Sequence, residues 1–284
     1  MSATLLSAGL SSASPLSAGR HAWEVTGHTR LFGILADPVT HVRTPMVFNA
    51  YFRAHDIDAV LVPIEVPSGQ LPILLGGLRA MTNLAGFVVT IPHKTAMAGL
   101  CDEVSREGRL IGAVNTVRRA RDGRLVGTMF DGVGFVAGLR AKGHEPRGCR
   151  VYLAGAGGAA SAVAFALADA GVACLTVFNR TAARAADLAT RVRAAYPTIE
   201  VAVGSADPSG HALAVNGTSL GLKPGDALPF EVSRLGADTV VAEVVMNPDT
   251  TPLLAAAAAR GCPIHLGRHM IEEQIRLMAD FIGA

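Results

Sequence analysis

Short apolar runs alternate with segments of helical periodicity along the first part of this chain. The runs at 30–35, 59–64 and 86–90 are short and end at polar or turn residues, which is typical of buried strands. The segments 45–55 and 68–80 between them repeat apolar residues at helical spacing and predict two helices. This alternation predicts an α/β fold with a parallel sheet.

Two helix starts have recognisable end signals. We expect Thr44 to cap the first helix, with Pro45 at its first helical position. A short helix after Pro92 carries Lys94, and a later helix begins at Asp131, whose side chain suits a cap.

The runs 113–117 and 124–129 flank a polar turn and predict a β-hairpin. Residues 142–150 then replace the periodic pattern with Gly, Pro and charged residues, which indicates a linker.

A second series of strands and helices follows the linker. Strands are predicted near residues 151, 174, 199, 212, 240 and 263. The last helix, 268–282, repeats apolar residues at helical spacing, and we expect it to pack back on the first domain. The predicted organisation is a disordered extension over 1–24, a first domain over 25–141 joined by 268–284, and a second, Rossmann-like domain over 142–267.

A glycine-rich turn, Gly155 to Ala160, follows the apolar run 151–154 and opens an alanine-rich helix. A strand, a glycine turn and a helix place free backbone N–H groups and the positive end of a helix beside a phosphate. Alone this signal is weak, since such turns also occur in proteins that bind no nucleotide.

A second signal strengthens the dinucleotide interpretation. About 24 residues after the glycine turn, the run 174–178 ends in Asn179-Arg180-Thr181. An NAD site prefers a carboxylate here, whereas an arginine suits a 2′-phosphate, so the pair of signals predicts NADP(H). The competing interpretation is that Arg180 is an ordinary surface arginine.

Composition excludes several classes of function. The 284 residues carry a formal charge of +2, which is close to neutral, and no basic block indicates nucleic acid. Four scattered cysteines indicate a reducing compartment, and we expect Cys174 and Cys262 to be buried in a cytoplasmic protein. The histidines lack metal-ligand spacing, and no apolar run approaches the ~20 residues of a membrane span.

Several motifs, in order, resemble the shikimate/quinate dehydrogenase family. The matching segments are Gly33-Ile34-Leu35-Ala36-Asp37-Pro38-Val39-Thr40-His41, Thr90-Ile91-Pro92-His93-Lys94, Gly112-Ala113-Val114-Asn115-Thr116, Asp131-Gly132-Val133-Gly134-Phe135, Gly155 to Ala159, Asn179-Arg180-Thr181 and Asn216-Gly217-Thr218-Ser219. The resemblance covers nearly the whole chain from about residue 30, and the order and spacing of the motifs are specific.

The resemblance implies two α/β domains and reversible hydride transfer between NADP(H) and a secondary alcohol or ketone on a small hydroxylated ring. It implies Lys94 and Asp131 as the catalytic pair, with the proton on either residue or passed between them. An ammonium suits the negative charge that develops on a reduced ketone oxygen. We expect a monomer or a homodimer.

The resemblance assigns the remaining site residues as well. It implies substrate contacts at Thr44, Val42, Thr90, Asn115 and Gln274. It implies dinucleotide contacts at Gly155, Ala156, Gly157, Gly158, Ala159, Asn179, Arg180, Thr181, Asn216, Thr218, Met246 and Gly267.

The chain departs from the family pattern at the end that binds the substrate carboxylate. The usual His-Ser-x-Ser-Pro is His41-Val42-Arg43-Thr44-Pro45, which loses one hydroxyl. Val88 stands where the family pattern has an Asn before Val-Thr. Met129-Phe130 stands where the pattern has Asn-Thr. Met246 stands where the family pattern has a tyrosine. Glu243, three residues earlier, stands where the pattern has an aspartate.

A buried carboxylate that loses hydrogen-bond partners is penalised by about 1–3 kcal/mol for each unsatisfied group. We therefore expect shikimate to be a poor substrate, unless Arg43, Arg268 or His269 forms a relocated anion site.

Three alternatives stay open at this point. The chain is an authentic shikimate or quinate dehydrogenase with compensated contacts; another two-domain NADP enzyme such as a methylene-tetrahydrofolate dehydrogenase; or a sensor that binds a metabolite or NADPH without turnover. An intact Lys–Asp pair favours an enzyme, because binding alone does not require it.

Overall fold

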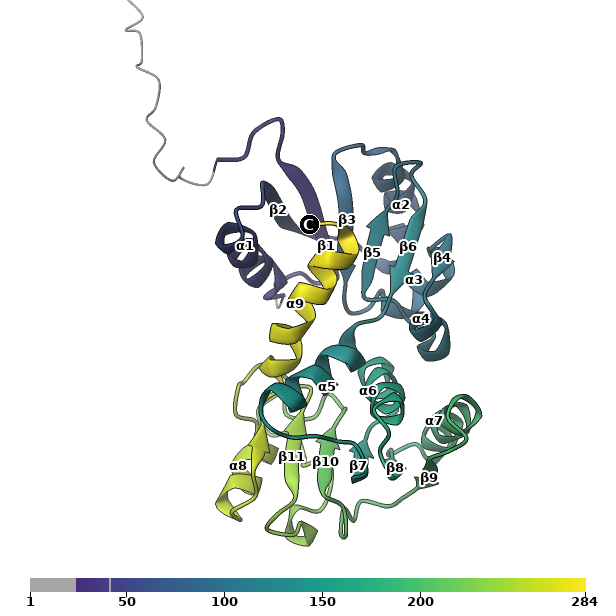
Figure 1. Cartoon of the computed structure of the whole chain (residues 1–284), viewed down its shortest axis with the longest axis vertical. Helices are drawn as coiled ribbons and strands as arrows, with labels where there is room; N and C mark the ends of the chain where they lie inside the picture. Colours follow the sequence, from purple (N-terminus) through teal and green to yellow (C-terminus); the bar gives the residue numbers. More distant parts are fainter. Residues whose placement is uncertain (1–23, 41) are drawn as a thin grey trace, which may run out of the picture.

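The protein consists of two α/β lobes, each built on its own six-stranded sheet (Figure 1). The computed structural model describes residues 24–40 and 42–284. The predicted extension over 1–24 therefore lies, apart from Glu24, outside the described residues.

The first sheet has the strand order β2-β1-β3-β5-β6-β4. Its parallel part joins β1 to β2 and β3, while β5 pairs antiparallel with β3 and β6, so the predicted hairpin is confirmed. The elements of this lobe are β1 (Arg30–Ala36), α1 (Thr44–Ala54), β2 (Ala59–Glu65), η1 (Ser68–Gln70), α2 (Leu71–Ala80), β3 (Leu84–Val89), α3 (Lys94–Leu100), β4 (Glu103–Val104), α4 (Arg106–Ile111), β5 (Thr116–Arg119) and β6 (Leu125–Thr128).

Both faces of the first sheet are covered. Leu35, Phe87 and Val89 pack on one face with apolar residues of α2 and α3. Phe32 and Ile34 pack on the other face with α1 and the last helix. Because successive strand residues point to opposite faces, a sheet buried on both faces needs the nearly continuous apolar runs seen in the sequence.

Two predicted helix caps are wrong. Thr44 is the first residue of α1, and the cap position belongs to Arg43, which makes no side-chain cap hydrogen bond. Asp131 is likewise the first residue of α5 (Asp131–Ala141), after Phe130 at the cap. In each case the preceding residue already has helical backbone angles and occupies the cap position, so the residue expected to cap the helix is its first helical residue.

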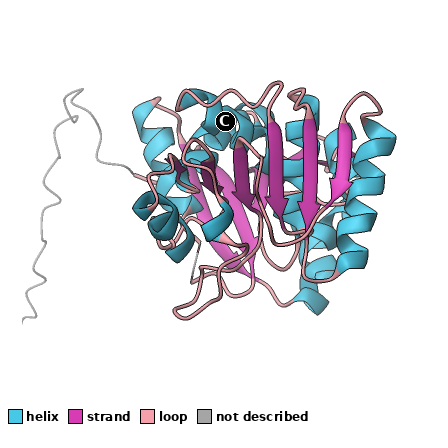
Figure 2. Ribbon diagram, turned by 90° about the horizontal axis from the view of Figure 1, so that it is seen from below, coloured by secondary structure: helices cyan, strands magenta, loops and turns pink. Residues whose placement is uncertain are grey.

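The second sheet has the order β12-β11-β10-β7-β8-β9, and all of its pairings are parallel. Seen from below, strands lie side by side with helices packed along them (Figure 2). Its elements are β7 (Arg150–Ala154), α6 (Gly158–Asp169), β8 (Cys174–Phe178), α7 (Ala182–Ala195), β9 (Glu200–Val203), β10 (Leu213–Asn216), η2 (Val232–Arg234), β11 (Val240–Glu243), α8 (Pro252–Ala259) and β12 (Ile264–His265).

Two helices connect the lobes. α5 packs against both α6 and the last helix, α9 (Arg268–Ile282). α9 runs from the second lobe back to the first, where Ile275, Met278 and Ile282 join the core beside α1 (Figure 1). The predicted return of the last helix to the first lobe is confirmed.

Glycines in α5 permit this close packing. A Cβ atom added at Gly132 would lie 2.0 Å from the Ala162 carbonyl oxygen of α6. One added at Gly134 would lie 2.2 Å from the Gln274 side chain of α9. The position of α5, and hence of Asp131 at its start, is fixed by these contacts.

Cys174 and Cys262 are buried, as predicted. Within residues 24–40 and 42–284, no helix combines the length and the apolarity that a bilayer crossing requires.

Candidate active site

The Lys94 ammonium and the Asp131 carboxylate form an ion pair between the first residues of α3 and α5. Lys94 Nζ lies 2.6 Å from Asp131 Oδ2. The lysine side chain is 23% exposed and the aspartate side chain 5%, so the ammonium is the member of the pair that solvent or a substrate reaches. The two residues come from α3 and α5 and are brought together only by the fold.

Two amides hold the other oxygen of the same carboxylate. Asn115 Nδ2 donates to Asp131 Oδ1 at 2.7 Å, and Gln274 Nε2 lies 3.5 Å from it. Both amide side chains are almost fully buried. Asn115 is itself fixed, because its Oδ1 accepts hydrogen bonds from Thr116 Oγ1 and the Phe130 backbone N–H, each at 3.0 Å.

Local backbone structure explains why these side chains converge. Lys94 begins α3 directly after the turn at Pro92, and its carbonyl accepts the Val114 N–H at 2.9 Å. The Asn115 carbonyl accepts the Val89 N–H at 2.7 Å, at the end of β3. The motifs around Lys94 and Asn115 are therefore adjacent in space, and Asp131 enters from the start of α5. A charged pair fixed by amides, with an ammonium that is partly exposed, is suited to proton transfer at a reacting oxygen.

The glycine turn leaves backbone open at the start of α6. A Cβ atom added at Gly157 or Gly158 would meet nothing within 4 Å, and both residues are exposed. Gly155 has φ of +113°, and a Cβ there would lie 2.9 Å from the Gly217 backbone. The turn thus offers free N–H groups at a helix start, with Ala156 and Ala159 beside them, which is the environment that a phosphate group requires.

The predicted 2′-phosphate segment lies at the end of the neighbouring strand. Asn179 Nδ2 donates to the Thr181 carbonyl at 3.0 Å and shapes the turn between β8 and α7. Arg180 is exposed at this turn, and among the described residues it has no ion-pair partner. Its guanidinium is available for an anion, so these residues fit an NADP group.

A buried polar cluster lies at the ends of β10 and β11. Asn216 Oδ1 accepts from Thr218 N at 3.0 Å and from Thr218 Oγ1 at 2.7 Å. Asn216 Nδ2 donates to both oxygens of Glu243, at 3.0 and 2.9 Å. Burial raises the pKa of the Glu243 carboxyl to about 7, against hydrogen bonds from Asn216 and Thr251 that lower it.

Glu243 departs from the family pattern, and the sequence alone assigns it no role. The available signal was an acidic residue ending the apolar strand Val240–Glu243, where a carboxylate is expected only with buried partners.

Met246 and Gly267 lie further along the same edge. Met246 is half-buried against the core of the second lobe. Gly267 precedes α9, and a Cβ atom there would lie 2.2 Å from the Val245 carbonyl oxygen, so only glycine permits this approach.

The predicted acid-binding residues are less polar than the pair at Lys94. Val42 is half-buried and packs against the core cluster of α1 and α9. Thr44 and Thr90 are half-buried, and no hydrogen bond of either hydroxyl group is found in the described part of the chain. Arg268 pairs with Asp249 at 3.0 Å, and His269 Nδ1 lies 2.9 Å from Glu272. These two candidates for a relocated anion site are therefore already engaged by carboxylates.

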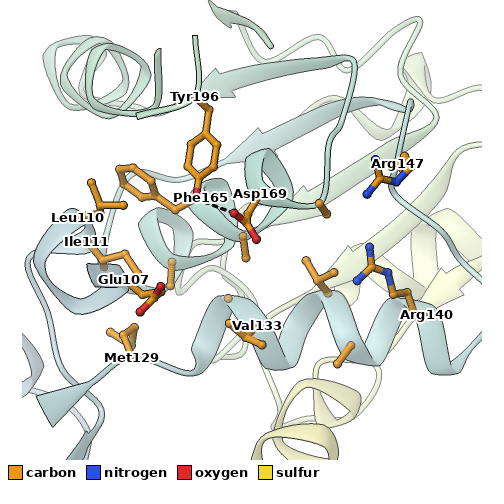
Figure 3. Close-up of a pocket in the computed structure, with 16 residues that line it drawn as sticks. Glu107, Leu110, Ile111, Met129, Val133, Arg140, Arg147, Phe165, Asp169 and Tyr196 are labelled. Atoms are coloured by element: carbon orange, nitrogen blue, oxygen red, sulfur yellow. Dashed lines mark hydrogen bonds between the residues drawn. The ribbon is translucent and has the colours of Figure 1, made fainter. Parts of the chain in front are cut away.

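A separate cavity of about 610 Å³ lies between α4, α5 and α6 (Figure 3). Val133, Leu110 and Phe165 line its apolar part, and Arg140 and Arg147 lie at one end. None of the predicted site residues lines it, so the Lys94–Asp131 pair and the glycine turn lie elsewhere. Nowhere in residues 24–40 and 42–284 do three or more His, Cys, Asp or Glu side chains form a group that could hold a metal ion.

The two lobes, the Lys–Asp pair and the open glycine turn define a two-domain α/β dehydrogenase architecture. Residues 34–117 match the shikimate dehydrogenase substrate binding domain, and residues 139–203 match the shikimate / quinate 5-dehydrogenase family. The chain is 40% identical to the shikimate dehydrogenase (NADP(+)) of Rubrobacter xylanophilus, over 87% of this chain and 88% of the relative.

Solved structures agree with this match. The ligand-free 5-ketofructose reductase of Gluconobacter sp. strain CHM43 superposes with a TM-score of 0.81 at 35% identity, covering 89% of this chain and 92% of the other. The shikimate 5-dehydrogenase of Thermus thermophilus in complex with NADP(H) and shikimate has a TM-score of 0.81 at 31% identity, covering 89% and 93%. The chain belongs to the shikimate dehydrogenase family of oxidoreductases.

Proposed function

We propose that this protein is an NADP-dependent oxidoreductase that interconverts a secondary alcohol and a ketone on a small hydroxylated ring. The observation that carries the proposal is the 2.6 Å pair of Lys94 and Asp131, with Asn115 and Gln274 on the second carboxylate oxygen. A pure binding site needs no such pair, so the geometry favours an enzyme over a sensor.

Each group has a chemical role in ketone reduction. The dinucleotide supplies the hydride when it is bound. Lys94 Nζ donates a proton to the oxygen on which negative charge develops, and Asp131 holds the ammonium in place. Asn115 and Gln274 orient the Asp131 carboxylate and offer amide groups to neighbouring substrate hydroxyls. In the reverse direction Lys94 accepts the proton of the alcohol.

NADP fits the second lobe better than NAD. The N–H groups of residues 156–159 serve the pyrophosphate, and the free guanidinium of Arg180 serves the 2′-phosphate. The curated relative in Rubrobacter xylanophilus is named for NADP(+), and the Thermus thermophilus structure is a complex with NADP(H). On this proposal, residues 142–267 form the dinucleotide domain, and residues 25–141 with 268–284 form the substrate domain.

The substrate end is altered relative to an authentic shikimate dehydrogenase. Val42 is half-buried against the apolar core, and Val88, at 5% exposure, stands where the family pattern has an amide. A substrate carboxylate placed there loses hydrogen bonds that cost about 1–3 kcal/mol each. Shikimate is therefore a poor substrate in this proposal.

A second candidate is the reduction of a polyhydroxylated ketone without a carboxylate. The 5-ketofructose reductase, at 35% identity and a TM-score of 0.81, is named for a substrate of this class. Its ketone and hydroxyl groups suit the Lys94–Asp131 end, and an uncharged opposite end suits the apolar surface at Val42.

Steady-state kinetics with NADP(H) test both candidates. We expect turnover of uncharged ring polyols or of 5-ketofructose with a kcat/KM at least tenfold above that for shikimate. Efficient turnover of shikimate at micromolar concentration would show that the acid-binding end is compensated. Absence of NADPH-dependent turnover with a broad panel of cyclic ketones would remove the enzyme proposal.

A further inference from the structure

Glu243 is a fully buried acid that the proposed chemistry does not use. It ends β11 with 0% exposure, and its strongest interactions are with neutral groups rather than with a cation. Its oxygens accept hydrogen bonds from Asn216 Nδ2, from Thr251 Oγ1 at 2.7 Å and from Val245 N at 3.4 Å. Every partner is a donor, which is the arrangement that an ionised carboxylate requires.

These hydrogen bonds join two loops at the carboxyl edge of the second sheet. Asn216 and Glu243 are paired in register on β10 and β11. Through Asn216, the carboxylate fixes the loop that contains Thr218 and Leu220. Asn216 Oδ1 accepts from Thr218 Oγ1, and Asn216 Nδ2 donates to the Leu220 carbonyl at 2.9 Å. Through Thr251, it fixes the far end of the loop after β11, where Thr251 caps α8.

Both loops touch the elements predicted to hold the dinucleotide. The Gly217 N–H donates to the Ala154 carbonyl at 2.7 Å, and a Cβ atom at Gly155 would lie 2.9 Å from the Gly217 backbone. On the other side, Gly267 approaches the Val245 carbonyl so closely that a Cβ there would lie 2.2 Å from it. The glycine turn and the loop at 244–247 are thus connected through Glu243.

We infer that Glu243 is a positioning residue for the dinucleotide, because its ionised carboxylate holds the loops after β10 and β11 in the arrangement that borders the glycine turn. This inference rests on the proposed NADP site. It adds a proton-linked control of cofactor affinity that the Lys94–Asp131 chemistry does not require.

The effect of Glu243 protonation on dinucleotide affinity falls in a defined range of pH. All partners of the Glu243 carboxylate are hydrogen-bond donors. Protonation of Glu243 therefore removes one acceptor position, breaks a hydrogen bond and loosens the loops. Since burial raises the pKa of this group to about 7, the loss falls between pH 8 and pH 6. Of the other titratable groups on the packed elements, His265 on β12 pairs with Ala242 and so points to the opposite face. Asp226 accepts the Gly221 N–H at the surface of the loop and stays ionised there because backbone hydrogen bonds lower its pKa.

Calorimetric titration of the full chain with NADP⁺ at pH 6 and pH 8 tests the inference. We expect the ratio of the Kd at pH 6 to the Kd at pH 8 to be about ten times larger for the natural protein than for Glu243→Gln, because one linked proton changes the affinity tenfold for each pH unit below a pKa of about 7. The 2′-phosphate of NADP⁺ titrates equally in both proteins and cancels from this comparison. An equal pH dependence in the two proteins would overturn the inference.

A second variant covers the case in which Glu243→Gln does not fold. Thr251→Val removes one hydroxyl donor to the carboxylate, which raises its pKa further, so the midpoint of the affinity loss moves to higher pH. A midpoint that does not move overturns the inference. If the natural protein binds NADP⁺ at neither pH, the proposed function itself fails; if it binds but Glu243→Gln shows the same pH profile, only this inference fails.

Discussion

The two carboxylate oxygens of Asp131 have different partners. Oδ2 lies 2.6 Å from the Lys94 ammonium nitrogen Nζ, and Oδ1 accepts a hydrogen bond from the Asn115 amide Nδ2 at 2.7 Å. The carboxylate is thereby locked in one orientation while the ammonium stays partly open to solvent. The relationship places a proton donor at the edge of the first lobe without leaving a buried charge unpaired.

Replacing the lysine tests this arrangement directly. We expect Lys94→Met to lower kcat by about 10²–10⁴-fold, the usual contribution of a positioned proton donor. NADP⁺ affinity should stay within about twofold of the natural value, because the second lobe is untouched. The matched control is Lys142→Met, an exposed lysine just after α5 whose loss should leave kcat unchanged. Retention of most activity in Lys94→Met would refute the assignment.

Arg180 sets the preference between the two dinucleotides in our proposal. We expect Arg180→Glu to raise the KM for NADP⁺ by about 10–100-fold, the range for losing a hydrogen bond to a charged group, while the KM for NAD⁺ changes little. Arg184→Glu, at an exposed position in the first turn of α7, controls for the change in net charge. Equal effects of the two substitutions would show that Arg180 acts only through general electrostatics.

Gly132 permits α5 to contact α6. Because a Cβ at this position would lie 2.0 Å from a backbone oxygen, we expect Gly132→Ala to destabilise the protein by about 1–3 kcal/mol in urea unfolding. The control is Gly76→Ala in α2, where a Cβ meets nothing within 4 Å and the gain in helix propensity should stabilise by about 0.5–1 kcal/mol. Similar results for the two variants would contradict the close packing of α5.

The buried His265 should make the stability of the second lobe decrease at acidic pH. Burial lowers the pKa of this histidine to about 4, with His269 and His144 adding to the effect, and its side chain packs beside Phe135. The unfolded chain therefore binds the proton more strongly, so stability is lost as the pH falls from about 6.5 to about 4. We expect His265→Phe to recover about 2–3 kcal/mol of the difference in unfolding free energy between pH 7 and pH 4.5.

His28→Phe, at an exposed position, controls for the general effect of replacing a histidine by a phenylalanine. If His265→Phe loses as much stability as the natural protein on acidification, other groups control the acid response.

The helices and strands could be predicted from the sequence because they depend on the local pattern of apolar residues. The apolar runs at β3 and β7 and the spaced apolar residues of α9 predicted their types and approximate ends. The caps at Thr44 and Asp131 were misjudged, because the cap position depends on the backbone angles of the residue before the helix, and the residue type alone does not set those angles.

The site was predictable only as a set of separate motifs. Lys94, Asn115, Asp131 and Gln274 were each named from short segments, yet their convergence depends on the β3–β5 pairing and on α9 returning to the first lobe. Glu243 had no visible role in the sequence, since its importance lies in zero exposure and in partners from β10 and α8.

The sequence by itself determined the alternation of strands and helices, the glycine turn and the residue types available for proton transfer and anion binding, because these depend on local periodicity and backbone freedom. Tertiary structure alone decided which oxygen of Asp131 faces the ammonium and which buried acid joins the loops of the second lobe. Those outcomes depend on burial and on distances between segments far apart in the chain, which no local pattern encodes.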